Sequence, residues 1–341
     1  MRHAAGSIVA CAVLAATLAN APASAEQPFY KDKTIRIIIS TGVAGGYMEY
    51  ARTLSEHMGA HIAGHPGFIV QSMPGAGGLL ATNHLYKIAP HDGTVMGIVH
   101  STVPLAPLWG NKGARFDALK FNWIGAFDRA PGLCVIWAKS PIKTWHDILT
   151  HEVTVGSSGA GSQMEAYPRL LNRLFGAKFK IVGGYKDGTD IYLAMERGEV
   201  EGSATPLESL TSYRADWVRD KKIKILVQYT RKRDPELADI PTMVELGKTD
   251  EGKKILAFYA SGADIGRSIL APPGLPLERV QTLRTAFDAM LKDPEFLADC
   301  KKLGIQVKPM SGADVQHLVA EIGEFPAALV PKARAARAAT K

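Results

Sequence analysis

Three glycines, Gly42, Gly45 and Gly46, stand between an apolar run at residues 35–39 and a stretch with helical spacing that begins near Tyr47. A buried strand, a glycine-rich turn and a helix in this order direct backbone N–H groups toward one point in space. The positive end of the helix dipole lies at the same point. The chemistry that this pattern favours is the binding of an anion, either as a ligand or as a substrate.

Three more turns of this kind follow later strands. They are PGAGG at 74–78, GSSGAGS at 156–162 and YKDGT at 185–189, and each precedes a helical pattern. In an open parallel sheet every strand-to-helix turn lies at the carboxyl edge, where ligands bind. Four such turns from two halves of the chain predict two lobes that face each other across a cleft.

The turns do not match the common catalytic or nucleotide-binding loops. Residues 75–80 lack the last glycine of a dinucleotide fingerprint, and no G-K-[ST] tripeptide forms a Walker loop. Ala160 stands where a nucleophile elbow needs its final glycine. Ser157 and Ser158 have no histidine or aspartate partner in the local pattern, although distant partners stay open. Binding is therefore favoured over catalysis.

His57, His61 and His65 are spaced by four, which would place them on one helical face and could suit a metal. Gly59, Gly64 and Pro66 indicate that the helix ends within this stretch, and we find no acidic residue nearby to complete a site. The pattern favours a surface helix without a metal.

Cys134 and Cys300 lie far apart in apolar patterns, and we expect two free thiols rather than a disulfide.

Short apolar runs alternate with helical stretches through most of the chain, which is typical of an α/β fold with parallel sheets and right-handed crossovers. After Pro272 and Pro273 the pattern is almost entirely helical. The predicted strands lie at 35–39, 68–70, 95–99, 123–127, 133–137, 153–155, 179–182, 200–204, 223–227 and 268–271.

The N-terminus predicts export. Arg2, an apolar stretch at 8–18 and small residues at 23–25 form the pattern of a cleaved secretory signal, so the mature chain is expected to begin at Glu26. A lipoprotein box at 8–11 is the alternative, but it leaves almost no apolar segment. The net charge of the full chain is +7, with interspersed charges, and nothing favours a nucleic-acid partner.

Seven motifs then occur in an order that resembles the extracytoplasmic solute receptors of the tripartite tricarboxylate transporter family. They are IRIII at 35–39 with Gly45 and Gly46, PGAGG at 74–78, PHDGT at 90–94, YKDG at 185–188, GEVEG at 198–202, DIPT at 239–242 and APPGLP at 271–276. The resemblance covers essentially 26–325. It implies a two-lobed, class II-like periplasmic binding protein with two mostly parallel sheets flanked by helices. It also implies a small carboxylate ligand, a membrane permease as partner and no cofactor.

Site residues follow from the resemblance position by position. It places Thr41, Gly45, Gly46 and Tyr47 at the cleft on the first lobe, and Ser157, Gly159, Ala160, Ser162, Asp187, Gly188 and Thr189 on the second. The family commonly has an aspartate where this chain has Met48, which leaves the ligand open. The two serines could instead be N-caps, and Tyr47 could simply cover the start of its helix. Arg129 is a candidate for a second carboxylate, with an ordinary salt bridge as the alternative.

We expect a signal peptide at 1–25, a discontinuous first lobe at 26–128 and 268–341, and a second lobe at 129–267. The two crossings between lobes, near residues 130 and 266, are the expected hinge. The protein is expected to be a monomeric periplasmic receptor without a metal or cofactor and without enzymatic activity. A ligand sensor for a signalling receptor and an exported hydrolase are the alternatives.

Overall fold

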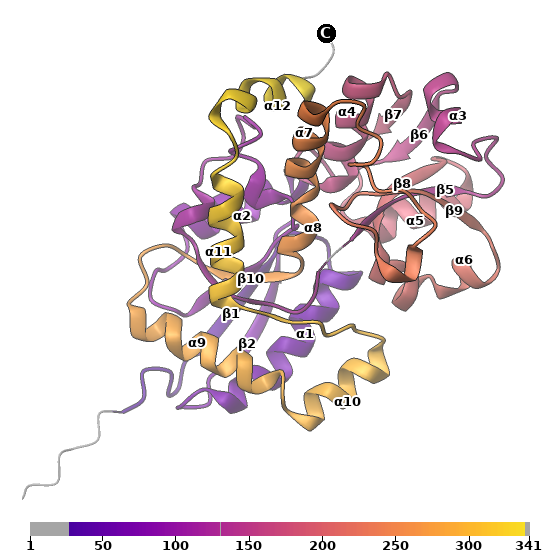
Figure 1. The fold of residues 1–341 in the computed structure, drawn as a ribbon. Coiled ribbons are helices and arrows are strands. Elements are labelled where there is room, and N and C mark those ends of the chain that lie inside the picture. The colour runs from indigo at the N-terminus through magenta and orange to yellow at the C-terminus, as the bar shows by residue number, and fades with distance from the viewer. Residues whose placement is uncertain (1–26, 130, 338–341) are drawn as a thin grey trace, which may run out of the picture.

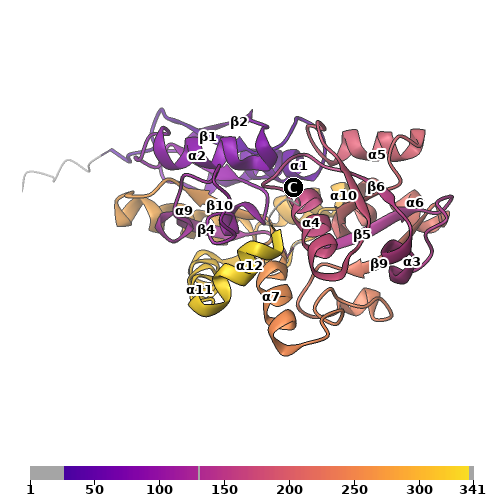
Figure 2. The same ribbon diagram turned by 90° about the horizontal axis from the view of Figure 1, so that it is seen from above.

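The computed structural model describes residues 27–129 and 131–337. It consists of two lobes that lie side by side, each with one sheet flanked by helices (Figures 1 and 2). The predicted two-lobed α/β fold is confirmed. The predicted signal peptide at 1–25 lies outside the described residues. No helix within 27–129 and 131–337 is both long and apolar enough to cross a membrane.

The first lobe has a six-stranded sheet in the order β11-β4-β10-β3-β1-β2. Strand β1 pairs in parallel with β2 and β3, whereas β10 runs antiparallel to β3 and β4. The strands are β1 Thr34–Ile39, β2 Gly67–Ser72, β3 Val95–Ile98, β4 Asn122–Ala126, β10 Ser268–Ala271 and β11 Met310–Ser311.

Helices cover both faces of this sheet. Ile35, Ile37 and Ile39 of β1 belong to one buried cluster, with residues of α1, α9 and α10. Ile38 points the other way, into the cluster that contains residues of α2 and α11, because successive side chains of a strand alternate between faces. The helices are α1 Gly46–His57, α2 Leu79–Lys87, α9 Leu277–Met290, α10 Pro294–Leu303, α11 Gly312–Gly323 and α12 Val330–Arg337.

The second lobe has a five-stranded sheet in the order β7-β6-β8-β5-β9. Strand β6 pairs in parallel with β7 and β8, and β5 runs antiparallel to β8 and β9. The strands are β5 Gly132–Trp137, β6 Val153–Gly156, β7 Phe179–Val182, β8 Gly202–Pro206 and β9 Ile223–Gln228. The helices of this lobe are α3 Trp145–Thr150, α4 Gln163–Phe175, α5 Gly188–Arg197 and α6 Ala215–Arg219. Helices α7 Asp250–Ala260 and α8 Gly262–Ile265 follow, and α8 contacts α11 of the first lobe.

Both sheets are mixed, and two of the strands that run against the majority, β5 and β10, each come directly after a crossing between lobes. In the first sheet β10 and β11 oppose the other strands, and in the second sheet β5 does so. Strand β5 is the first strand after the chain enters the second lobe, and β10 is the first after it returns. Most strands of each sheet still point one way, which places the strand-to-helix turns of each lobe at one edge.

The two crossing segments lie next to each other. Phe127 N donates to Arg267 O at 3.2 Å, and Arg267 N donates to Asp128 O at 3.2 Å. Gly266 has a φ of +64°, and a Cβ at this position would collide with the carbonyl oxygen of Asp128. Only glycine combines this backbone conformation with such a close approach.

Helices α7 and α12 connect the lobes away from these crossings. Figure 1 shows α12, in yellow, above α11 and beside α7, and α12 also contacts α4 of the second sheet's lobe. Tyr259 of α7 donates its hydroxyl to Ala333 O at 2.9 Å, and its ring stacks on Trp109 at 4.8 Å. Helix α12 is therefore packed against both lobes.

Candidate functional site

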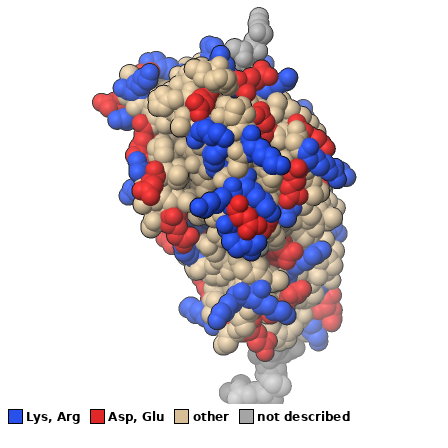
Figure 3. Space-filling view, turned by 90° about the vertical axis from the view of Figure 1, so that its right-hand side faces the viewer, with Lys and Arg blue, Asp and Glu red and all other residues tan. Residues whose placement is uncertain are grey.

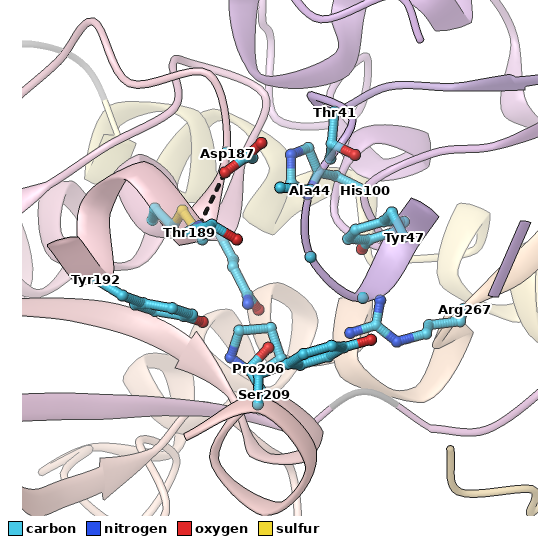
Figure 4. A pocket seen from close by; sticks show the side chains of 16 residues that line it. Thr41, Ala44, Tyr47, His100, Asp187, Thr189, Tyr192, Pro206, Ser209 and Arg267 are labelled. Carbon is cyan, nitrogen blue, oxygen red and sulfur yellow. Dashed lines mark hydrogen bonds between the residues drawn. The ribbon is translucent and has the colours of Figure 1, made fainter. Parts of the chain in front are cut away.

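A cavity of about 40 Å³ lies between the lobes (Figure 4). It faces the turn between β1 and α1 on one side, and the starts of α4 and α5 with the segment after β8 on the other. Its lining residues are Thr41, Ala44, Gly45, Gly46, Tyr47, His100, Gln163, Met164, Asp187, Gly188, Thr189, Tyr192, Pro206, Ser209, Tyr213 and Arg267.

The glycine-rich turn forms the first-lobe wall. Gly45 has a φ of +85°, and α1 begins at Gly46, so the start of this helix borders the cavity. The first N–H groups of a helix have no acceptor within it and can bind an anion. Thr41 is buried, and its carbonyl accepts from the Ser72 hydroxyl at 2.6 Å, which holds the turn to the end of β2.

Tyr47, His100 and Arg267 form a packed group on the same side. The ring of Tyr47 meets the ring of His100 edge-on at 5.0 Å, and the Tyr47 hydroxyl accepts from Ser101 N at 3.3 Å. Burial, with a smaller contribution from Arg267, lowers the pKa of His100 to about 4. The imidazole is therefore neutral near pH 7, and among the described residues that line the cavity Arg267 is the only positively charged one.

The guanidinium of Arg267 points into the cavity (Figure 4) and lies 4.5 Å from the Tyr47 ring centroid and 4.8 Å from that of Tyr50. Its Nη2 forms an ion pair with Oε1 of Glu208, which follows β8 in the second lobe. Both side chains are almost completely buried, at 1% and 4% exposed. Within the described residues, Arg267 Nε and Nη1 and Glu208 Oε2 have no hydrogen-bond partner.

Asp187, Gly188 and Thr189 form part of the second-lobe wall, at the start of α5. Asp187 is the N-cap, since its Oδ1 accepts from Thr189 N at 2.9 Å and from Asp190 N at 3.2 Å. Burial raises the pKa of its carboxyl group. Its other oxygen approaches Gly42 so closely that a Cβ there would collide with it.

The serine-rich turn lies beside the cavity without lining it. Ser157 donates to Glu165 Oε2 at 3.0 Å, and Ser162 donates to Gly159 O at 2.8 Å. The same turn contacts the first lobe directly, because Gly161 N donates to Ala76 O at 3.0 Å. In this conformation Gly159 and Ser162 thus belong to a contact between lobes, whereas Ser157 bonds within its own lobe and neither Ser157 nor Ala160 lines the cavity.

Arg129 lies apart from the other candidates. It lines a separate cavity of about 410 Å³, together with Pro131, residues 230–235, Ala263 and Asp264. The structure therefore does not bring Arg129 together with the glycine-rich turn. The cation at the cleft is Arg267, from the second crossing instead of the first.

Sequence reasoning missed Arg267, Glu208, His100, Tyr192 and Ser209 as neighbours of the cleft. One signal for Arg267 was present, because an arginine between Gly266 and the apolar run 268–271 is out of place in a buried strand unless it is paired. The other residues carry no comparable local signal.

Two expectations concern sites away from the cleft. Cys134 in β5 and Cys300 in α10 are buried and free, as predicted.

The histidine stretch needs a correction, because acidic residues do stand nearby. His57 contacts Asp299 at 3.1 Å and His61 contacts Asp293 at 3.0 Å. Both aspartates come from the distant α10 region, which the local sequence could not reveal.

Comparisons with known proteins agree with this architecture. The family profile described as "Tripartite tricarboxylate transporter family receptor" matches residues 50–332. The "UPF0065 protein in gbd 5′region" of Cupriavidus necator is 26% identical over 337 residues, covering 97% of this chain and 96% of that protein.

Two solved structures share the fold. The periplasmic binding protein BugD is 22% identical, with a TM-score of 0.68 over 89% of this chain and 98% of that one. MatC from Rhodopseudomonas palustris with bound malate is 20% identical, with a TM-score of 0.68 over 90% of this chain and 99% of that one. The profile spans most of the chain, and the seven ordered motifs pointed to the same family. The chain therefore belongs to the tripartite tricarboxylate transporter receptor family.

Proposed function

We propose that this protein is a periplasmic receptor that captures a small carboxylate between its lobes and delivers it to a membrane permease. One observation carries the proposal. The turn 41–46 and the start of α1 border a cavity that the second lobe closes from the opposite side. Malate bound in MatC, a protein of the same fold, supports the ligand class.

The energetics of such a site suffice for a receptor. A micromolar dissociation constant corresponds to about 8 kcal/mol. A hydrogen bond to a charged group contributes about 1.5–3 kcal/mol, and a partly buried helix N-terminus up to about 2 kcal/mol. Several N–H and O–H donors around one carboxylate therefore reach the required range, before the cost of closing the lobes is deducted.

The cavity is too small for a dicarboxylate in this conformation, so capture requires the lobes to open. We propose that lobe one comprises 26–128 and 268–341, that lobe two comprises 129–267, and that the paired crossings at Asp128 and Arg267 are the hinge. Small-angle scattering should give a smaller radius of gyration with ligand than without. Identical curves at saturation would contradict the hinge.

A thermal-shift screen tests the ligand class. Malate, succinate, adipate and citrate are each added to the purified mature protein, with sodium chloride at matched ionic strength as the control. A ligand at 100 times its dissociation constant should stabilise the protein by about 2.7 kcal/mol. If no carboxylate shifts the melting temperature beyond the salt control, the proposed function is wrong.

Localisation and partners are part of the same proposal. The mature chain should begin at Glu26 in the periplasm, as a monomer, and associate with permease subunits in its ligand-bound form. Mass spectrometry of the periplasmic fraction tests the first point. Cross-linking to membrane proteins, with and without the ligand from the screen, tests the second.

Figure 3 shows Lys and Arg interspersed with Asp and Glu over the second-lobe face, with no single-sign surface there.

A further inference from the structure

The ion pair between Arg267 and Glu208 spans the cleft. Arg267 lies at the start of β10, against the first lobe, and Glu208 follows β8 in the second lobe. The pair is therefore made when the lobes are together, and opening the cleft separates its members. It links the two lobes at the edge of the ligand cavity.

The pair is incompletely hydrogen-bonded for its burial. Nε and Nη1 of Arg267 and Oε2 of Glu208 have no partner within the described residues, and all three atoms are inaccessible to water. A buried ion pair is stabilising only when its remaining donors and acceptors are satisfied. A guanidinium offers five N–H donors, and a planar carboxylate fits two of them at once. Glu208 thus satisfies only part of the donor set of Arg267.

The Glu208 carboxylate lies beside the start of α1 and next to Arg267. A Cβ on Gly46, the first residue of α1, would lie 3.2 Å from Glu208 Oε1 and 3.2 Å from Arg267 Nη2. The carboxylate of Glu208 is therefore next to both the helix start and the cation. The cavity that Gly46 and Arg267 line has a volume of about 40 Å³, which is room for a few water molecules.

We propose that Arg267 binds the ligand's carboxylate, and that Glu208 occupies the same place when the cleft closes without ligand. The inference rests on the proposed function. Two carboxylates this close to one cation repel each other, and the described residues of the lining offer no second positive charge to balance them. Ligand and Glu208 therefore compete for Arg267, and specificity is for anions that bind this guanidinium better than Glu208 does.

The alternative is that Glu208 holds a positively charged group of the ligand, such as an ammonium. The two possibilities make opposite predictions for Glu208→Gln, which keeps the shape of the side chain and removes its charge. If Glu208 competes, the variant binds carboxylates about tenfold more tightly, because one charged contact on Arg267 is released. If Glu208 contacts the ligand, the variant binds more weakly.

The experiment is isothermal titration calorimetry with malate, succinate, adipate and citrate, each titrated into the parent and the variants. Arg267→Met should lose about 100-fold or more in affinity. Because this variant leaves Glu208 buried without its partner, the double variant Glu208→Gln with Arg267→Met is included. It removes the charge of Glu208 together with that of Arg267, and it should fold but still not bind. Glu245→Gln, which breaks the exposed pair with Arg233, is the matched control and should bind like the parent.

The outcomes separate the two proposals. If neither the parent nor Glu208→Gln binds any of the four anions, the proposed function is wrong. If the parent binds one of them and Glu208→Gln binds it equally or more weakly, the function stands and the competition is refuted. Unchanged affinity in the folded double variant would show that Arg267 does not bind the carboxylate.

Discussion

Substituting Gly77 by alanine should keep the cleft from closing. Gly77, in the turn before α2, meets the backbone of the serine-rich turn of the other lobe. A Cβ there would collide with backbone atoms of Gly159, Gly161 and Ser162. Backbone atoms cannot rotate away as a side chain can, so the two turns must separate. The hydrogen bond from Gly161 N to Ala76 O would then be lost.

The magnitude follows from what the second lobe adds to binding. If closure fails, the ligand loses one or two hydrogen bonds to its charged group, each worth about 1.5–3 kcal/mol. The expected loss is about 3 kcal/mol, or about 100-fold in affinity. Alanine also resists a φ of +66°, by about 1–2 kcal/mol. That strain exists in the open and closed forms alike, and it should lower stability without affecting closure.

Gly176→Ala is the matched control. Gly176 has a φ of +68°, and a Cβ there would have nothing within 4 Å, so it carries the same backbone strain without the collision. The assays are calorimetry with the strongest ligand of the carboxylate screen and small-angle scattering with and without it. Gly176→Ala should bind and contract like the parent. If Gly77→Ala also does so, the lobes do not close through this contact and the reasoning is wrong.

Three further predictions concern the cavity wall and the hinge. Gly46→Val should abolish binding with an unchanged circular dichroism spectrum, because its Cβ would lie 3.2 Å from both Arg267 Nη2 and Glu208 Oε1; calorimetry giving the parent's affinity would contradict this. His100 should destabilise the protein in acid, since burial lowers its pKa from 6.5 to about 4. In that interval the unfolded chain binds a proton at His100 and the folded protein does not. The free energy of unfolding therefore falls by about 3 kcal/mol as the pH falls across the interval. Urea unfolding at both ends of the interval should show a smaller loss for His100→Gln, and an equal loss would refute the assignment. Asp128 should act in the opposite direction, because burial raises its pKa from 3.8 to about 6. The folded state keeps this proton longer, so stability declines by about 3 kcal/mol as the pH rises across that interval. Asp128→Asn should remove most of this pH-dependent decline in the free energy of unfolding. If urea unfolding shows the same decline in the variant as in the parent, the assignment to Asp128 is wrong.

The parts of the site that could be predicted are those written in one short stretch of sequence. The turns at Gly45 and at Asp187 each follow a strand and begin a helix, and that local order is enough to place them at the carboxyl edge of a sheet. The fold class follows from the same alternation, repeated along the chain. The β10 strand that runs against its sheet does not, because strand direction depends on where the chain re-enters the lobe.

The parts that could not be predicted depend on contacts between distant segments. Arg267 and Glu208 are 59 positions apart and meet only because two lobes come together. Ser162 belongs to a turn with the right residues, yet the opposite lobe covers it in this conformation. Arg129 belongs to the segment between β4 and β5, and the chain there faces another cavity. Local sequence specifies a turn, whereas the partner across the cleft decides what that turn contacts.

The position of β10 also sets the order in which the molecule can assemble. This strand lies in the middle of the first sheet, between β3 and β4, although the whole second lobe precedes it in the chain. Until residues 268–271 are available, β3 and β4 each have an unpaired edge, and such edges tend to pair wrongly with other chains. The second lobe can form its sheet from a continuous segment, whereas the first must wait for contacts of long sequence separation, which form slowly. A chain synthesised from its N-terminus therefore completes its first lobe last. If synthesis stops before Ser268, the second sheet can be complete, whereas β3 and β4 of the first sheet lack the strand that joins them.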